Sequence, residues 1–257
     1  MQRLFYVAYG VGCHLLFLAT YVYMAGFFGN FLVPKSIDSA PSDALAGIVI
    51  NISLIAVFSL QHSIMARPWF KERWTRIVPK PIERSTYVLL SCVALFVLMW
   101  QWRSLTGVVW DVEQPVGRML LWGLFAAGWF LVPAVSLMIN HFDLFGTRQV
   151  WLFWKRKPYT DLPFKTPALY SRIRHPLYVG WALAFWATPT MTVGHALLAG
   201  VLTLYMAIAV VFEERDLVQH FGKGYREYQR RVPKFVPRFG AANEGVEAAA
   251  AVGAMGS

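Results

Sequence analysis

Charged residues are scarce in this chain of 257 residues. They make up only 15% of it, whereas 57% of the residues are hydrophobic and 16% are aromatic. Average domains have about 25% charged residues, so this composition excludes an ordinary soluble protein. It predicts an integral membrane protein.

Cysteine is scarce as well. Cys13 and Cys92 both lie inside apolar runs, where a free cysteine usually behaves as a small buried hydrophobe, so we predict no disulfide. The spacing of the six His and two Cys matches no metal-ligand pattern, and no metal site is predicted. A phosphate-binding glycine loop is also lacking.

A cleavable leader is another feature that we do not find. The first apolar run, residues 4–32, is too long for the apolar region of a signal peptide and has no convincing small-residue cleavage site. We therefore expect this run to remain as the first membrane span.

Long apolar runs dominate the chain instead. About 20 helical residues cross a hydrocarbon core of ~30 Å. Four runs can each form one such span: residues 4–32, 44–65, 87–102 and 116–139. A fifth run, residues 177–212, is too long for one span, and Thr188-Pro189-Thr190 and Gly194-His195 can make a turn near its middle. The last run therefore predicts a helical hairpin.

The fold expected from these runs is all-α. It is a polytopic membrane helical bundle with four single spans and a C-terminal helical hairpin, giving five to six crossings, and with a cytoplasmic C-terminal helix. The Lys and Arg residues support one orientation. If the N-terminus is inside, 21 of the 24 fall in cytoplasmic segments, and only Lys35, Arg103 and Arg118 fall outside. The net charge of +10 then indicates orientation and attraction to anionic lipids, not nucleic-acid binding.

Ionisable groups gather at the predicted cytoplasmic ends of the spans. Asn140-His141-Phe142-Asp143 follows the fourth span, Arg174-His175-Pro176 precedes the fifth, and Glu213-Glu214 ends the sixth. Such positions are functional candidates in a membrane protein. Because the hairpin makes an even number of crossings, its two charged ends return to the same face, and we expect one polar pocket there.

The residue types suggest what this pocket binds. Pro176 favours the first position of a helix, and the free N–H groups of that helix, with Arg174, suit an anion. Glu213 and Glu214 are expected at a helix C-terminus, where acids oppose the helix dipole. This placement suggests a cationic or hydroxyl-bearing ligand. The alternative is ion pairing with nearby arginines on a solvated face.

Asp143 suggests a different role. Beside Phe142 and Leu144 at a membrane interface its carboxylate would be partly desolvated, which raises its proton affinity and suits a general base. The alternative is that Asp143 caps a short helix that begins near Leu144. His62, at the end of the second span, and His14, within the first, are further polar candidates.

Several of these elements recur together in one group of proteins. They are Arg174-His175-Pro176-Leu177-Tyr178-Val179-Gly180, the hairpin, Glu213-Glu214, and a tail with Phe221-Gly222, Tyr225, Tyr228 and Val232-Pro233. In this order they resemble the isoprenylcysteine carboxyl methyltransferase superfamily of membrane methyltransferases. Residues 61–70 and 81–87 look NnrU-like. With residues 29–38 included, nearly the whole chain resembles the bacterial methanethiol S-methyltransferases, which make dimethyl sulfide.

The resemblance implies an organisation for the chain. Residues 1–139 would form transmembrane helices 1 to 4, the NnrU-like part, and residues 140–239 would form the catalytic part with the hairpin. Residues 240–257 are expected to be a disordered tail. The distribution of Lys and Arg predicts that both termini are in the cytoplasm. The resemblance implies a protein of the bacterial inner membrane with its active site on the cytoplasmic face.

The resemblance also implies S-adenosylmethionine as the methyl donor. The residues assigned to it are Tyr170, Arg174, His175, Tyr178, Glu213 and Glu214. We expect Asp143 to take the proton of the thiol, directly or through a water, with His141 as runner-up. The expected partners are a small thiol and membrane lipids, without nucleic acid, and the oligomeric state is not readable.

Two other functions remain open from the sequence. One is methylation of a larger lipidic thiol or a prenylcysteine carboxylate, which needs a lateral opening between helices. The other is a non-enzymatic NnrU-like membrane protein of nitrogen-oxide metabolism.

Overall fold

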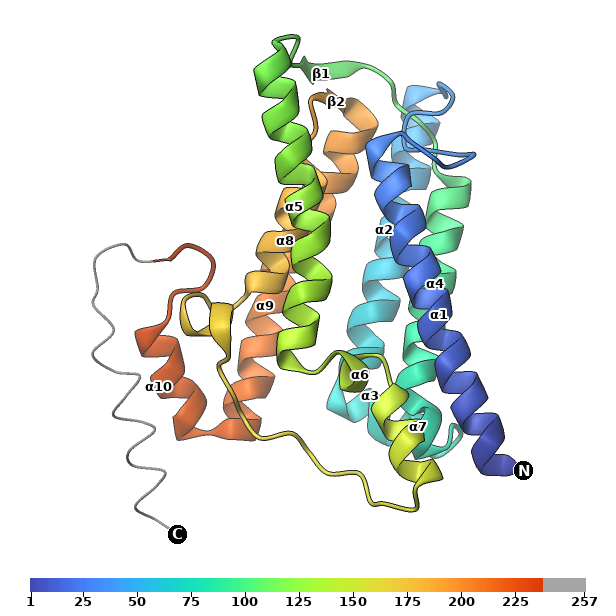
Figure 1. Ribbon diagram of the computed structural model, residues 1–257. Helices are drawn as coiled ribbons and strands as arrows, with labels where there is room; N and C mark the ends of the chain where they lie inside the picture. Colours follow the sequence, from blue (N-terminus) through green and yellow to red (C-terminus); the bar gives the residue numbers. More distant parts are fainter. Residues whose placement is uncertain (238–257) are drawn as a thin grey trace.

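Five long helices form the body of the protein. The computed structural model describes residues 1–237, so the predicted tail, residues 240–257, lies outside the described residues. All five helices are long and apolar enough to cross a membrane, with mean hydropathy between 1.6 and 2.1 over their most apolar windows. They are α1 (Gln2–Gly29), α2 (Ala44–Ala66), α4 (Lys80–Gln101), α5 (Pro115–Ile139) and α9 (Val193–Phe221) (Figure 1). The expected all-α polytopic membrane bundle is confirmed.

Short elements connect these helices at the two ends of the bundle. The end that holds the N-terminus carries α3 (Pro68–Trp74), α6 (His141–Leu144), α7 (Thr147–Trp154) and α10 (Lys223–Arg231). A 3-10 helix (Ala168–Ser171) lies higher, beside the start of the next helix. At the opposite end β1 (Val108–Asp111) pairs antiparallel with β2 (Thr190–Thr192). The predicted C-terminal helix is therefore present as α10, at the same end as the N-terminus.

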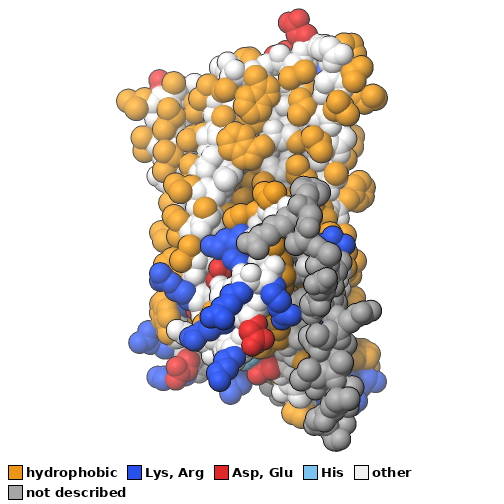
Figure 2. Space-filling view, turned by 90° about the vertical axis from the view of Figure 1, so that its left-hand side faces the viewer, with side chains coloured by type: hydrophobic (Ala, Val, Ile, Leu, Met, Phe, Trp, Pro, Cys, Tyr) orange, Lys and Arg blue, Asp and Glu red, His pale blue; other side chains and the backbone are white. Residues whose placement is uncertain are grey.

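The surface of the bundle is apolar where it would meet lipid. Large hydrophobic side chains such as Leu120, Phe130 and Leu204 are exposed on the outside of the long helices. Figure 2 shows hydrophobic side chains over the upper part of one face and Lys and Arg gathered over the lower part. This separation matches a bundle whose lower end lies at an aqueous interface.

The predicted hairpin is present, but its arms differ in length. Its first arm, α8 (Pro176–Trp186), has 11 residues and is followed by a connecting segment, residues 187–192, that contains β2. At 1.5 Å per residue α8 is about 16 Å long, roughly half of the hydrocarbon core. The start of α8 therefore lies part-way along α5, above its lower end (Figure 1). The residues at the start of α8 therefore lie inside the bundle, above the end that holds the N-terminus.

Two glycines allow α8 to pack closely against α5. A Cβ added at Gly128 would lie 2.5 Å from the backbone nitrogen of Ala184 and 2.8 Å from the backbone oxygen of Gly180. Backbone atoms cannot yield as side-chain ends do, so this position requires a glycine. This close contact sets the position of α8 along the length of α5.

We predict that Gly128→Ala destabilises the protein by about 1–3 kcal/mol, the usual effect of overpacking a close contact. Gly123→Ala on the same helix is the matched control, because a Cβ there meets nothing within 4 Å. Unfolding in detergent micelles measures both. Equal stability of the two variants would contradict the close contact.

Candidate active site

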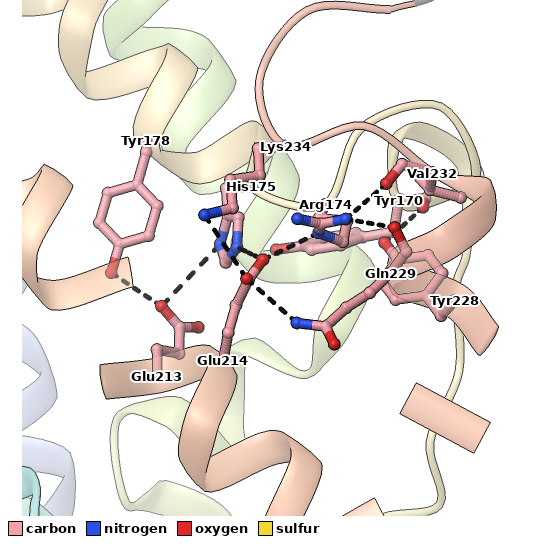
Figure 3. A network of polar contacts seen from close by, with 10 residues as sticks. All are labelled: Tyr170, Arg174, His175, Tyr178, Glu213, Glu214, Tyr228, Gln229, Val232 and Lys234. Atoms are coloured by element: carbon pink, nitrogen blue, oxygen red, sulfur yellow. Dashed lines mark hydrogen bonds and ion pairs between the residues drawn. The ribbon is translucent and has the colours of Figure 1, made fainter. Parts of the chain in front are cut away.

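The buried carboxylate of Glu214, on α9, contacts the segment before α8 and also α10. Glu214 of α9 accepts a hydrogen bond from Arg174 Nε at 2.8 Å on its Oε1 atom, and His175 Nε2 lies 3.0 Å from the same oxygen. Arg174, His175 and Glu214 each expose less than a tenth of their surface. Arg174 and His175 come from the segment before α8, so this contact ties the start of α8 to α9 (Figure 3).

The other polar atoms of this cluster hold the segment after α10. Arg174 Nη1 donates to the backbone oxygens of Gln229 at 2.6 Å and Val232 at 2.8 Å. Gln229 Nε2 donates to Glu214 Oε2 at 3.1 Å, and Lys234 Nζ lies 3.7 Å from that oxygen. We call Arg174, His175, Glu214 and Gln229 the clasp. Both carboxylate oxygens of Glu214 are engaged by protein groups in it.

The neighbouring glutamate is in a different state. Glu213 exposes 44% of its side chain, compared with 10% for Glu214. Tyr178 Oη donates to Glu213 Oε2 at 2.8 Å, and His175 Nδ1 lies 4.0 Å from the same atom. Glu213 and Tyr178 therefore form an open pair beside the closed clasp, and this pair is accessible to a ligand.

Tyr170 lies next to the open pair. Its backbone oxygen accepts a hydrogen bond from Tyr228 Oη at 2.6 Å, which fastens the 3-10 helix to α10. Burial raises the pKa of the Tyr170 phenol above its ordinary value, and the negative charge of Glu213 raises it further. Tyr170 is therefore a neutral phenol at physiological pH, able to donate a hydrogen bond.

The structure brings together all six residues assigned to the methyl donor. Their surroundings differ from the expectation in one respect. Glu213 and Glu214 do not end a helix, because α9 continues to Phe221 and stops at Gly222, whose φ is +60°. α9 extends beyond the end of the apolar run at residue 212, because polar residues outside the membrane can continue a helix. The two glutamates therefore do not oppose a helix dipole at a C-terminus, contrary to the prediction, and Glu214 pairs with Arg174 instead.

Some residues that contact Glu214 were not predicted from the sequence as part of the site. Gln229 and Lys234 reach Glu214 from the tail, and no spacing in the sequence marked them. Tyr228, which holds Tyr170, belongs to the recurring tail pattern and could have been found from it.

Asp143 lies in a separate part of the molecule. It accepts hydrogen bonds from Arg148 at 2.9 Å, from Gln149 at 3.3 Å and from Tyr159 at 3.3 Å. It lines a cavity of about 730 Å³ between α3, α4, α7 and residues 157–161, and none of the six residues assigned to the methyl donor lines this cavity. The suggested cap at Asp143 is wrong, because Asn140 caps α6. The role of Asp143 as a base stays a prediction.

His141 contacts a second histidine. Its Nε2 atom lies 3.1 Å from His14 Nε2, and its Nδ1 atom lies 2.7 Å from Ser136 Oγ. Burial, and then the neighbouring His14, lower the pKa of His141 below its ordinary value. The ring is therefore neutral at physiological pH. Its catalytic role also stays a prediction.

Within residues 1–237, no group of three or more His, Cys, Asp or Glu side chains could hold a metal ion. The polar groups that the structure brings together at the site are those of the clasp, the open pair and the phenols around them. These features define a class: a polytopic membrane protein with a buried polar site between the start of α8 and the lower half of α9.

Comparison with known proteins identifies the family within this class. The chain is 49% identical over 241 residues to a methanethiol S-methyltransferase of Crocosphaera subtropica, covering 93% of this chain and 94% of that protein. It is 49% identical over 238 residues to a methanethiol S-methyltransferase of Mycobacterium tuberculosis, covering 92% and 98%. A more distant relative is Nurim of Rattus norvegicus, 29% identical over 184 residues, covering 67% and 69%. No family model and no solved structure matches. The chain belongs to the methanethiol S-methyltransferase family.

Proposed function

We propose that this protein transfers a methyl group from S-adenosylmethionine to methanethiol and releases dimethyl sulfide. Membership of the family, with similarity along nearly the whole chain, supports the reaction. The single structural observation that carries the proposal is the open Glu213–Tyr178 pair beside the closed clasp, because it offers a rigid polar site at the recessed start of α8.

The open pair fits the polar groups of S-adenosylmethionine. A partly exposed carboxylate such as Glu213 accepts hydrogen bonds from ribose hydroxyls or from an ammonium group. Tyr178 and Tyr170 can orient the same groups, and the N–H groups at the start of α8 suit a carboxylate. When bound, S-adenosylmethionine supplies a methyl group that is already activated on a sulfonium sulfur.

In this proposal the clasp positions the site and the open pair binds. Arg174 Nε and Nη1, His175 Nε2 and both carboxylate oxygens of Glu214 contact other protein groups. They hold α8, α9 and the tail in fixed relation, which aligns the two reacting sulfur atoms. Three of the six residues assigned from the sequence therefore belong to the clasp and support the site. The other three, Tyr170, Tyr178 and Glu213, face the ligand in this proposal.

An aromatic cluster can enclose the small thiol. Trp181 lies one turn after Tyr178 on α8, with its ring centroid 5.7 Å from Trp129 of α5 and 5.9 Å from Tyr21 of α1. Methanethiol offers almost nothing to hydrogen-bond, so its selection depends on a small dry space. We assign that space to the neighbourhood of these three rings.

The orientation is part of the proposal. The N-terminus, α10 and the clasp all lie toward the end of the bundle where Figure 2 shows Lys and Arg. The excess of basic residues marks the cytoplasmic side. We infer a bacterial inner-membrane enzyme with both termini and the methyl-donor site on the cytoplasmic side.

Headspace gas chromatography tests the proposed function. Purified protein in detergent, supplied with S-adenosylmethionine and methanethiol, is expected to release dimethyl sulfide. Turnover of only a long-chain thiol or a prenylcysteine would identify a lipidic acceptor instead. If calorimetry detects no binding of S-adenosylmethionine at millimolar concentration, the enzymatic function is excluded.

A further inference from the structure

Trp129 of α5 carries a buried hydrogen-bond donor without an acceptor. The residue is only 6% exposed, and its indole Nε1 atom has no hydrogen-bond partner within residues 1–237. Tryptophan N–H groups usually find a partner when they are buried, and a buried donor without one is unfavourable. The rarity of such atoms in folded proteins means that this one requires an explanation.

Aromatic rings surround this indole. Four of them have centroids at 5.1, 5.7, 5.9 and 6.1 Å from a ring centroid of Trp129, and they belong to Tyr21, Trp181, Phe125 and Phe28. In such apolar surroundings a hydrogen bond is electrostatically stronger than in water. The unpaired N–H therefore belongs to the same aromatic cluster to which the thiol is assigned.

A proline on the same helix explains how the main chain of Trp129 is satisfied while its side chain is not. Pro133 follows four residues later and has no N–H, so the backbone oxygen of Trp129 lacks its helical donor. The hydroxyl of Tyr21, on α1, donates to this oxygen at 2.5 Å. This bond fastens Trp129 to α1 through its main chain and leaves the indole N–H for another acceptor.

Close packing connects the indole with the methyl-donor site. Gly128, which precedes Trp129, makes the close contact with the backbone of Gly180 on α8. Trp181 follows Gly180 directly, and Tyr178 of the open pair lies one turn before Trp181. Tyr178 also packs against the hydrophobic cluster that contains Trp129. A thiol held at Trp129 therefore lies against the helix that carries the open pair.

We propose that the indole N–H of Trp129 donates a hydrogen bond to the sulfur atom of the bound acceptor. This inference rests on the proposed function and deepens it. A neutral thiol sulfur is a weak acceptor, whereas hydrogen bonds to ionised groups are about twice as strong as neutral ones. The N–H therefore favours the thiolate, which is the nucleophilic form. One lone pair of the thiolate accepts this bond, and another remains to attack the methyl carbon.

The same bond weakens after the methyl group has been transferred. The carbon–sulfur bond of the donor breaks with its electron pair left on the donor sulfur, and an electron pair of the thiolate forms the new bond. The proton of the thiol goes to water in the net reaction, and Trp129 neither gains nor loses a proton. The product is a neutral thioether and thus a weak acceptor, so the N–H does not retain it.

Two replacements of Trp129 test this hydrogen bond. Trp129→Phe removes the N–H with part of the ring, whereas benzothienylalanine, introduced at an amber codon, has a sulfur atom in place of the N–H and keeps the shape. We expect kcat/KM for methanethiol to fall about 10- to 100-fold in both, the usual contribution of a hydrogen bond to a charged group. The affinity for S-adenosylmethionine, measured by calorimetry, should not change.

Trp122→Phe is the matched control, because Trp122 lies on the same helix and is 37% exposed. It should keep the parent kcat/KM.

Two further readouts separate this role from a structural one. The benzothienylalanine variant should unfold at the parent temperature or above it, because the replacement removes a buried donor that has no partner. A structural hydrogen bond of the indole would instead lower this temperature. The rise of kcat with pH, which reports the bound complex, should move up by about one to two pH units, since the lost bond stabilised the thiolate.

Nuclear magnetic resonance observes the N–H itself and does not depend on turnover. The protein is labelled with 15N-tryptophan and bound to S-adenosylhomocysteine, which cannot donate a methyl group, and Trp129→Phe identifies the indole signal of Trp129. Added methanethiol should move this proton signal downfield, as the formation of a hydrogen bond does. An unmoved signal, or parent kcat/KM in the benzothienylalanine variant, overturns the inference while the proposed function stands. If the parent makes no dimethyl sulfide, the proposed function fails, and this inference fails with it.

Discussion

Replacement of Glu214 by alanine is expected to abolish methyl transfer and to lower the free energy of unfolding by about 3–5 kcal/mol, because it leaves a buried cation without its partner. Arg174 and Glu214 have side chains exposed by only 8% and 10%, and Arg174 Nε donates to Glu214 at 2.8 Å. The same carboxylate also accepts from Gln229. Its loss therefore loosens α8, α9 and the tail together.

Unfolding of the Glu214→Ala protein in detergent micelles, monitored by tryptophan fluorescence, measures this effect. Limited proteolysis should cut near residues 229–234 in the variant and not in the parent, because their contacts with Arg174 and Glu214 hold this segment. A Glu214→Ala protein that is as stable as the parent would show that the clasp does not hold the end of the bundle.

Glu213→Ala is expected to raise the dissociation constant of S-adenosylmethionine about 10- to 100-fold, because a hydrogen bond to a charged group contributes about 1.5–3 kcal/mol. The stability of the protein should change little. Glu213 exposes 44% of its side chain, and its hydrogen bond with Tyr178 can be replaced by water.

The two glutamates are neighbours on one helix and serve as controls for each other. Calorimetry with S-adenosylmethionine and unfolding in micelles are measured on both variants. We expect Glu213→Ala to weaken binding with unchanged stability, and Glu214→Ala to lose both. If Glu213→Ala binds with the parent affinity, the open pair is not the methyl-donor site.

The sequence was sufficient for much of the architecture. The four single spans follow from the length of the apolar runs, because a membrane helix must cover a fixed thickness. Two turn sites were predicted for the hairpin. Thr188-Pro189-Thr190 lies in the segment that joins α8 and α9, whereas Gly194-His195 is wrong as a turn, because both residues lie in the first turn of α9. The six residues assigned to the methyl donor also lie together, as expected for two ends of one hairpin.

Other features were not readable from hydrophobicity. α8 has only 11 residues, because it begins at Pro176, part-way along α5. The close contact between Gly128 and α8 sets the position of α8 along α5. The third span begins at Lys80 and not at residue 87, since Pro81 in its first turn starts a helix before the apolar run begins. Such boundaries depend on packing and on helix starts outside the membrane.

The roles of neighbouring residues were also hidden. Adjacent residues on a helix point in different directions, so Glu213 and Glu214 look equivalent in the sequence although one is open and the other is buried. The environment of Asp143 depends on Arg148 and Tyr159, which come from a helix and a loop that the apolar pattern does not describe.

Transfer of a labelled methyl group tests the central claim most directly. Purified protein is supplied with S-adenosylmethionine that carries a deuterated methyl group and with unlabelled methanethiol, and the headspace is analysed by mass spectrometry. Our account predicts dimethyl sulfide with one deuterated and one unlabelled methyl group, in amounts that match the S-adenosylhomocysteine formed. Unlabelled dimethyl sulfide, or S-adenosylhomocysteine without dimethyl sulfide, would contradict it.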